Sequence, residues 1–316
     1  MTQVFAVAEC NRPALVAFAQ ESISRGSKSF RFASRLFDRT TRERVWLLYA
    51  WCRKCDDMAD GQDHGGTMEA VTDPQARLQA IRKLTAMALA GTPTGEPAFD
   101  CLGVVARECG LTPRMAEDVI EGFALDAADW HPRRESDLYQ YCYHVAGAVG
   151  VMMAVVMGVA ADDDATLDRA CDLGLAFQLA NIARDIAEDD AAGRCYLPDD
   201  WLAMLDIGPG EHMKPHNRKK LALMGRWLAD EAEQYEASAR VGAKHLPLRA
   251  RWAVLSAAGI YGEIARKVRA ANAQAWDQRI FTSRPEKFRW VRKAFVDAVA
   301  NNPRYMNRDA LWTRSR

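Results

Sequence analysis

The distribution of apolar and polar residues along the chain favours helices over strands. Clusters of Gly and Pro divide the sequence into long segments that are rich in Ala, Leu, Met, Arg and Glu. These residues are good helix formers, whereas the alternating β-branched runs that mark strands are scarce. Strands do not alternate with helices, as they would in a parallel sheet. The sequence therefore predicts an all-α protein.

Start signals for helices support this prediction. Thr72-Asp73-Pro74 and Thr112-Pro113 each combine an N-capping residue with a proline in the first turn, and the segment from Ser283 to Glu286 matches a capping box. We find no linker, tandem repeat or low-complexity tract in the sequence. We therefore expect one all-helical domain over residues 1–316, with residues 1–20 and 295–316 as peripheral tails.

One segment carries no formal charge. Residues 138–161 contain no Asp, Glu, Lys or Arg over 24 positions, which is long enough to span a bilayer. The flanks argue against insertion, because Asp137 precedes the segment, three aspartates follow it, and no excess of Lys or Arg would orient a span. We therefore expect Leu138 to Ala161 to form a buried central helix.

A first group of charged residues shares one predicted helical face. At about 100° per residue, Tyr49, Arg53, Asp56 and Asp60 fall within an arc of roughly 60°, with Asp57 beside it. Carboxylates four residues apart repel one another, so an acidic stripe that faces inward needs a compensating cation. For this segment taken alone, a solvated acidic face is the alternative.

A second acidic stripe makes a metal site the better explanation of both. Gln178, Asn181, Asp185 and Asp189 share an arc of roughly 80° on one predicted helix, and Arg184 lies next to them. Carboxylate and amide oxygens are the ligands that Mg²⁺ prefers, usually together with substrate phosphates and water. Two such faces opposed across a helical bundle would hold Mg²⁺ ions with a diphosphate between them.

Composition narrows the classes of function. The chain has 42 Lys and Arg against 42 Asp and Glu, and nucleic-acid binders normally show a basic excess, so no nucleic-acid partner is expected. Eight scattered cysteines in a long apolar chain, without a secretory signal, indicate reduced thiols in a cytosolic protein. Because the sequence has no dinucleotide-binding or phosphate-loop motif, no nicotinamide cofactor is expected.

Two further pairs of residues are weak candidates for metal binding. Cys52 and Cys55 have a C-x-x-C spacing, but they lie inside a predicted helix with no second pair to complete a zinc site. His212 and His216 are four residues apart, but the prolines around them predict a loop rather than a helix. We expect solvated loop histidines.

At the two acidic stripes the chain resembles the squalene/phytoene synthase family, and most closely its bacterial phytoene synthases. The resemblance covers roughly residues 20–290. Its other motifs are Ser27-Lys28-Ser29-Phe30, the segment from Tyr141 to Gly147, the segment from Gly193 to Pro198, Tyr261, and the segment from Ala275 to Arg279. The resemblance implies a helical bundle of the isoprenoid-synthase type with a central hydrophobic cavity.

The resemblance also implies roles for individual residues. Metal ligands would be Asp56, Asp60, Asn181, Asp185 and Asp189, with Asp57 in support. Substrate phosphates would be met by Ser27, Lys28, the backbone of Phe30, Tyr49, Arg53, Arg184, Tyr261 and Arg279. Tyr141, Gln178 and Tyr196 would lie near the reacting carbons. The catalytic set implied is Asp56, Asp60, Asp185 and Asp189 with Arg53 and Arg184.

The implied reaction is the Mg²⁺-assisted (or Mn²⁺-assisted) condensation of two geranylgeranyl diphosphates to phytoene through prephytoene diphosphate, in carotenoid biosynthesis. Released diphosphate and a pocket tyrosine are both candidate proton acceptors. The main alternative is a dehydrosqualene or squalene synthase that uses farnesyl diphosphate, because donor length depends on the depth of the cavity. A non-catalytic assembly protein of the same family is disfavoured, since every motif aspartate is present.

Basic residues near the C-terminus are candidates for contact with lipid. The segment from Arg284 to Lys293 and the arginines at 304, 308, 314 and 316 could meet anionic headgroups or form a merely solvated surface. Because the implied substrate and product are lipids, a peripheral contact with the inner face of the cell membrane, or with other carotenoid enzymes, is left open.

Overall fold

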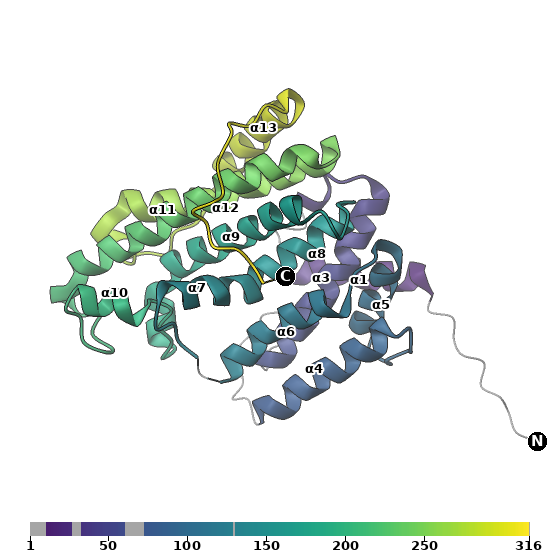
Figure 1. Cartoon of the computed structure of the whole chain (residues 1–316), viewed down its shortest axis with the longest axis horizontal. Coiled ribbons are helices and arrows are strands. Elements are labelled where there is room, and N and C mark those ends of the chain that lie inside the picture. Colours follow the sequence, from purple (N-terminus) through teal and green to yellow (C-terminus); the bar gives the residue numbers. More distant parts are fainter. Residues whose placement is uncertain (1–10, 27–32, 61–72, 129, 316) are drawn as a thin grey trace, which may run out of the picture. The chain divides into compact units, whose positions relative to one another are not determined.

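The computed structural model describes residues 11–26, 33–60, 73–128 and 130–315, and within these ranges the regular secondary structure is helical, without a strand (Figure 1). This confirms the predicted all-α class. The chain divides into two compact units, Met1–Ile120 and Glu121–Arg316, and the division falls within helix α6 (Pro113–Ala127). Each unit is described by itself below.

The first unit packs its helices around α3. Its elements are α1 (Arg12–Gly26), α3 (Arg39–Asp60), α4 (Pro74–Leu89), α5 (Pro97–Cys109) and the first part of α6. Helix α3 contacts α1, α4 and α5. Trp51 on α3 is fully buried and donates its indole N–H to the hydroxyl of Thr85 on α4 at 3.2 Å. The core of this unit thus forms between α3 and the three helices that contact it.

Helix starts agree with the sequence signals. Asp73 caps α4 by accepting a hydrogen bond from the N–H of Ala76 at 2.9 Å, and α6 begins at Pro113. The capping box of α13 (Arg284–Ala300) is formed, because Ser283 N–H donates to Glu286 at 2.7 Å. These three predicted starts are confirmed.

Helix α9 (Asp164–Ala191) is the central helix of the second unit (Figure 1). The other elements are α7 (Glu135–Cys142), the π-helical turn η1 (Tyr143–Gly147), α8 (Ala148–Val156), α10 (Asp199–Met204), η2 (Pro215–Asn217), α11 (Arg218–Gly242), η3 (Ala243–His245), α12 (Leu248–Ala271), η4 (Asn272–Gln274) and α13. Helix α9 contacts η1, α8, α11 and α12, and α13 packs on α12.

The uncharged segment forms one continuous helical run instead of a single regular helix. The run begins with α7, passes through η1 and ends with α8 at Val156, and most of its residues are buried. The predicted end at Ala161 is wrong, because Gly158 has φ +99° and such a left-handed residue terminates a helix. Across the described residues, no helix is long and apolar enough to span a membrane.

The uncharged run crosses α9 with the two backbones in close contact. A Cβ atom on Gly174 of α9 would collide with the carbonyl oxygen of Ala146, and one on Gly150 would lie 2.6 Å from the carbonyl oxygen of Ala170. Only glycine allows so close an approach. The run is therefore fixed directly on the helix that carries the second acidic stripe.

The C-terminal segment is tied to the N-terminal half of α9. Arg308 makes two hydrogen bonds of 2.8 Å to the buried carboxylate of Asp172. Arg314 pairs with Asp164 at 2.6 Å and with Asp168 at 2.9 Å. The prediction of a solvated or lipid-facing surface is therefore wrong for Arg308 and Arg314, whose charges find partners on α9. Arg316 lies outside the described residues.

Candidate active site

The first acidic stripe lies on the C-terminal half of α3. Arg53 connects its carboxylates, with Nη1 at 2.9 Å from Asp56 Oδ2 and Nη2 at 2.7 Å from Asp57 Oδ1. Asp57 is the more buried of the two aspartates, and Asp56 is the more exposed. Arg53 is therefore the cation that compensates this stripe. Asp60 is the last residue of α3, and its side chain is outside what the structure describes.

One donor atom of Arg53, Nε, is not used by the ion pairs with Asp56 and Asp57. This Nε is buried and has no hydrogen-bond partner among the described residues. Tyr49, one turn earlier, is partly buried, and desolvation raises the pKa of its phenol. The hydroxyl of Tyr49 packs against Gly26, the end of α1, where a Cβ would collide with it. The phosphate-binding candidates Ser27, Lys28 and Phe30 lie outside the described residues.

The second stripe lies on the C-terminal half of α9 and is held by two arginines. Arg184 makes two hydrogen bonds to the carboxylate of Asp185, one of them 2.7 Å long from Nε. Arg279, from the loop between η4 and α13, reaches Asp185 at 3.0 Å and Glu188 at 2.9 Å. The structure thus brings Arg279 to Arg184 and Asp185, which are neighbours in the sequence but lie far from Arg279 along the chain.

Asp189, one turn beyond Asp185, is short of positive charge. Burial and the nearby charge of Asp185 raise the pKa of Asp189 to about 6, and Arg194 and Arg184 offset this only in part. Gln178 and Asn181 are half-buried on the same helix. Within the described ranges, no three Asp, Glu, His or Cys side chains converge as a metal site on their own.

An aromatic cluster lies beside this stripe in the second unit. Tyr141 stacks on Tyr196 with ring centroids 4.9 Å apart and on Trp130 at 5.2 Å. Its hydroxyl donates to Asp126 at 3.0 Å, and the hydroxyl of Tyr196 lies 3.5 Å from the same oxygen. Burial raises the pKa of both tyrosines, so they are neutral phenols near pH 7.

Tyr261 also adjoins the second stripe. It stacks on Phe177 of α9 with centroids 4.4 Å apart. Burial raises the pKa of Tyr261, and the positive charge of Arg184 acts in the opposite sense. Tyr261 is therefore close enough to Arg184 for the positive charge to act on the pKa of its phenol.

Sequence reasoning missed Asp126 and Trp130, which complete the aromatic cluster. Asp126 is the penultimate residue of α6, where the helix dipole disfavours a carboxylate. An acid in such a position needs a specific donor, and two tyrosine hydroxyls supply it. This mismatch with the dipole was the available signal.

The weak metal candidates do not form metal sites in the described ranges. His212 is buried, and its Nε2 lies 3.3 Å from Asp190 at the end of α9, so the expected solvated histidine is wrong there. His216 is exposed, as expected. Cys52 and Cys55 are free thiols on α3, and burial raises the pKa of both, which leaves them protonated.

The chain is similar to known proteins in both sequence and fold. The sequence profile of the squalene/phytoene synthase family matches residues 23–286. The 15-cis-phytoene synthase of Pantoea ananas is 46% identical over 308 residues, which cover 96% of this chain and 99% of that protein. The 15-cis-phytoene synthase of Paracoccus sp. (strain N81106 / MBIC 01143) is 44% identical over 302 residues, 95% of this chain and 98% of that one.

A solved structure of a dehydrosqualene synthase in complex with ligand has the same fold. Its TM-score is 0.80 at 26% sequence identity, and the match covers 92% of this chain and 98% of that chain. The expected isoprenoid-synthase fold is therefore confirmed.

Proposed function

The chain belongs to the squalene/phytoene synthase family, and we propose that it is a phytoene synthase, a prenyltransferase that joins two geranylgeranyl diphosphates head to head. The observation that carries this proposal is the 46% identity to a 15-cis-phytoene synthase over 96% of the chain. In the first step one donor ionises, the double bond of the second captures the cation, and prephytoene diphosphate forms. In the second step this intermediate ionises, rearranges and gives phytoene. Each step releases one diphosphate and one proton.

The donor set suits a hard divalent cation. Asp56, Asp60, Asn181, Asp185 and Asp189 offer only oxygen ligands, and Mg²⁺ commonly takes one or two carboxylates and completes its shell with substrate phosphates and water. The raised pKa of Asp189 is consistent with a carboxylate that lacks a cation. Bound there, Mg²⁺ or Mn²⁺ would neutralise the diphosphate leaving group.

Arginines would share the binding of phosphate. Arg184 and Arg279 both pair with Asp185. If Asp185 binds a metal ion instead, the two guanidinium groups become available to phosphate oxygens. Arg53 offers the buried Nε donor that has no partner in the described part of the chain. Positive groups set in advance where negative charge develops stabilise the departing diphosphate.

The aromatic cluster would protect the carbocation. Tyr141 and Tyr196 are neutral, stacked and hydrogen-bonded to Asp126, so their positions are fixed. Aromatic faces attract a cation without forming a covalent adduct, and apolar walls exclude water. The run from α7 to α8 supplies uncharged wall residues next to α9.

Product analysis tests the proposed donor. Purified protein is incubated with Mg²⁺ and either geranylgeranyl or farnesyl diphosphate, and the extracted hydrocarbon is identified. Phytoene from the longer donor is expected. A product from farnesyl diphosphate alone would overturn the assignment in favour of a dehydrosqualene or squalene synthase, the class of the solved structure described above.

We also propose that the protein is cytoplasmic and meets the inner face of the membrane through α13. Phe288, Val296 and Val299 are 69%, 62% and 58% exposed. They fall within an arc of roughly 80° of that helix, together with Arg292. Apolar side chains beside basic ones match an anionic bilayer surface in both polarity and charge.

Vesicle binding tests this surface. The protein should co-sediment with vesicles that contain phosphatidylglycerol, and Phe288→Ser with Val296→Ser should lower the bound fraction at least fivefold. Met204→Ser is the matched control, because Met204 is 68% exposed on α10 of the same unit. Equal loss in the control variant, or no loss in the α13 variant, would contradict the proposal.

A further inference from the structure

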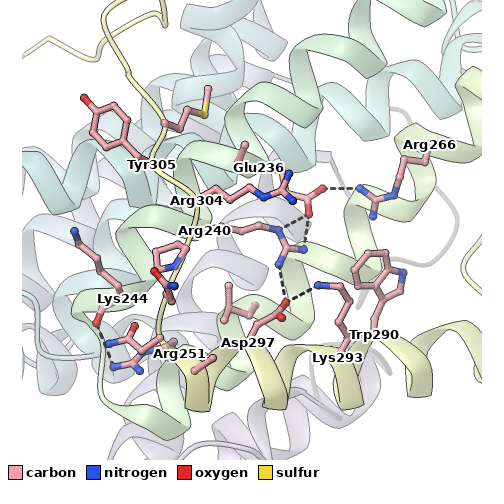
Figure 2. Close-up of a pocket in the computed structure, with 17 residues that line it drawn as sticks. Glu236, Arg240, Lys244, Arg251, Arg266, Trp290, Lys293, Asp297, Arg304 and Tyr305 are labelled. Carbon is pink, nitrogen blue, oxygen red and sulfur yellow. Dashed lines mark hydrogen bonds and ion pairs between the residues drawn. The ribbon is translucent and has the colours of Figure 1, made fainter.

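A concave site lies in the C-terminal unit and is formed by other residues than the acidic stripe of α9. Its cavity of about 690 Å³ is lined by α11, η3, α12, α13 and the segment that follows α13 (Figure 2). None of the residues of the candidate active site contributes to its wall. A cavity of this volume accommodates a small organic ligand. We call it the basic pocket.

Positive charge dominates the wall of the basic pocket. Six lining side chains are cationic and two are acidic. The cations are Arg240, Lys244, Arg251, Arg266, Lys293 and Arg304, and the acids are Glu236 and Asp297. The chain as a whole has equal numbers of acids and bases, so this local excess of four positive charges favours an anion as ligand.

The two acids account for only three of the six cations. Glu236 is buried and takes Arg240 at 2.6 Å and Arg266 at 2.9 Å. Asp297 takes Lys293 at 2.7 Å, and Arg240 lies 3.9 Å from it. Figure 2 shows these contacts along one side of the pocket.

The other three cations have no acidic partner in the part of the chain that the structure describes. Arg251 donates to the carbonyl oxygens of Ala298 at 2.8 Å, Leu246 at 2.9 Å and Lys244 at 3.1 Å, and its Nε is buried without a partner. The side chains of Lys244 and Arg304 are exposed. Arg251 is thus a fixed charge that carbonyl dipoles hold but do not neutralise.

Trp290 gives the pocket a rigid floor. Its indole N–H donates to Glu263 at 3.0 Å, and its ring packs so closely on Gly259 that a Cβ there would collide with it. The guanidinium of Arg266 lies 4.8 Å from the ring centroid and that of Arg240 lies 5.8 Å away. Arg240 and Arg266 therefore keep their places before any ligand binds, which lowers the entropic cost of binding.

We propose that the basic pocket binds a small anion that carries phosphate groups, at a site separate from the one that ionises the substrate. Guanidinium forks and ammonium groups match phosphate oxygens in charge and geometry, and several together favour a multiply charged anion. Two sources share this chemistry: free inorganic diphosphate and the phosphate headgroup of a lipid. The proposal does not depend on the proposed reaction.

Calorimetric titration tests the site without turnover. Inorganic diphosphate is titrated into the protein with EDTA present, so that no divalent cation assists binding elsewhere. One saturable site is expected, and Lys244→Glu with Arg304→Glu should weaken its Kd at least tenfold. The control variant carries Lys219→Glu and Arg226→Glu, two exposed residues of α11 outside the pocket, and its Kd should stay within twofold of the unmodified protein.

A second titration identifies the source of the phosphate. Dibutyryl phosphatidic acid, a soluble lipid headgroup, replaces diphosphate under the same conditions. Tighter binding of this probe with the same loss in the pocket variant assigns a lipid headgroup, and tighter binding of diphosphate assigns the free anion. The proposal is overturned when neither probe saturates, or when the pocket variant binds both probes like the unmodified protein. Thermal unfolding of both variants verifies that each remains folded.

Discussion

Each half of α9 carries an aspartate that is paired with arginine, but the two sets of ion pairs differ in burial. In the N-terminal half, Asp172 is fully buried, Arg308 is 14% exposed, and the hydroxyl of Ser238 donates to the same carboxylate at 2.5 Å. In the C-terminal half, Asp185 is 19% exposed; Arg184, its bidentate partner, is 16% exposed, and its second arginine, Arg279, is 56% exposed. Arg308 and Arg184 each bind their aspartate with two hydrogen bonds, so the geometry of the ion pair alone does not distinguish the two halves.

The difference lies in what each pair can do when another ion arrives. Breaking an enclosed pair leaves an uncompensated charge in a low dielectric, at a cost of about 3–5 kcal/mol. A pair whose arginine reaches water can exchange partners at a much smaller cost. We therefore interpret Asp172 with Arg308 as a tether of the C-terminal segment, and Asp185 with Arg184 and Arg279 as a site prepared to exchange a carboxylate for a phosphate.

The largest expected effect is the loss of turnover in Asp185→Asn. The substitution keeps the shape of the side chain and removes its charge, so turnover should fall by about 10³-fold. The melting temperature should change little, because Asp185 is itself partly exposed and Arg279, which is 56% exposed, can be hydrated. Single-turnover assays with purified, folded protein measure the effect. If the variant keeps more than a tenth of the original rate, the C-terminal half of α9 does not carry the catalytic acidic stripe.

The converse is expected for Asp172→Asn. This change strands Arg308 beside a neutral amide and should lower the free energy of unfolding by about 3–5 kcal/mol. Turnover per folded molecule should stay within a factor of about two, since Asp172 touches no candidate site residue. Urea unfolding and active-site-normalised kinetics give the two numbers.

A double variant separates the tether from an unspecific loss of packing. Asp172→Leu with Arg308→Met removes both charges, and apolar replacements of a buried pair are often neutral. It should therefore be more stable than Asp172→Asn. If it is less stable, the buried charges themselves do not explain the loss.

The middle of α9, where the uncharged run crosses it, should be sensitive to a single methyl group. In Gly174→Ala the new Cβ meets the backbone of Ala146, which cannot turn aside, so a loss of about 3 kcal/mol in unfolding free energy is expected. Gly122→Ala is the comparison: its new Cβ would lie 3.0 Å from the side chain of Val145, which can shift, and 3.2 Å from the nearest backbone atoms, a much looser fit than at Gly174. Equal losses in the two would mean that the backbone crossing is not what makes glycine necessary.

Local periodicity predicted the acidic face of the C-terminal half of α9 but not the ion pair of its N-terminal half. Gln178, Asn181, Asp185 and Asp189 repeat at helical spacing, so their common face could be predicted, as could the capping box at Ser283. Nothing local connects Asp172 with Arg308, because 136 residues separate them. Tertiary contacts of this kind follow from how helices pack and leave no trace in spacing.

The same limit explains the other surprises. Asp126 is paired with Tyr141 and Tyr196 by the packing of separate elements, and His212 is buried against the end of α9 by the loop before α11. The end of α8 at Val156, in contrast, was within reach, since Gly158 is a local signal that the uncharged composition obscured.

The smallest expected effect is also the most direct comparison of the two halves: the stabilisation of the protein by Mg²⁺. A ligand that binds only the folded state at ten times its Kd adds about 1.4 kcal/mol, which shifts the melting temperature of a chain this long by about 2 °C. Protein stripped with EDTA should show this shift on addition of Mg²⁺, and Asp185→Asn should lose it. Asp172→Asn should melt lower at the outset and still gain the same increment, because its missing charge belongs to the tether. A full Mg²⁺ shift in Asp185→Asn together with none in Asp172→Asn would exchange the roles of the two halves.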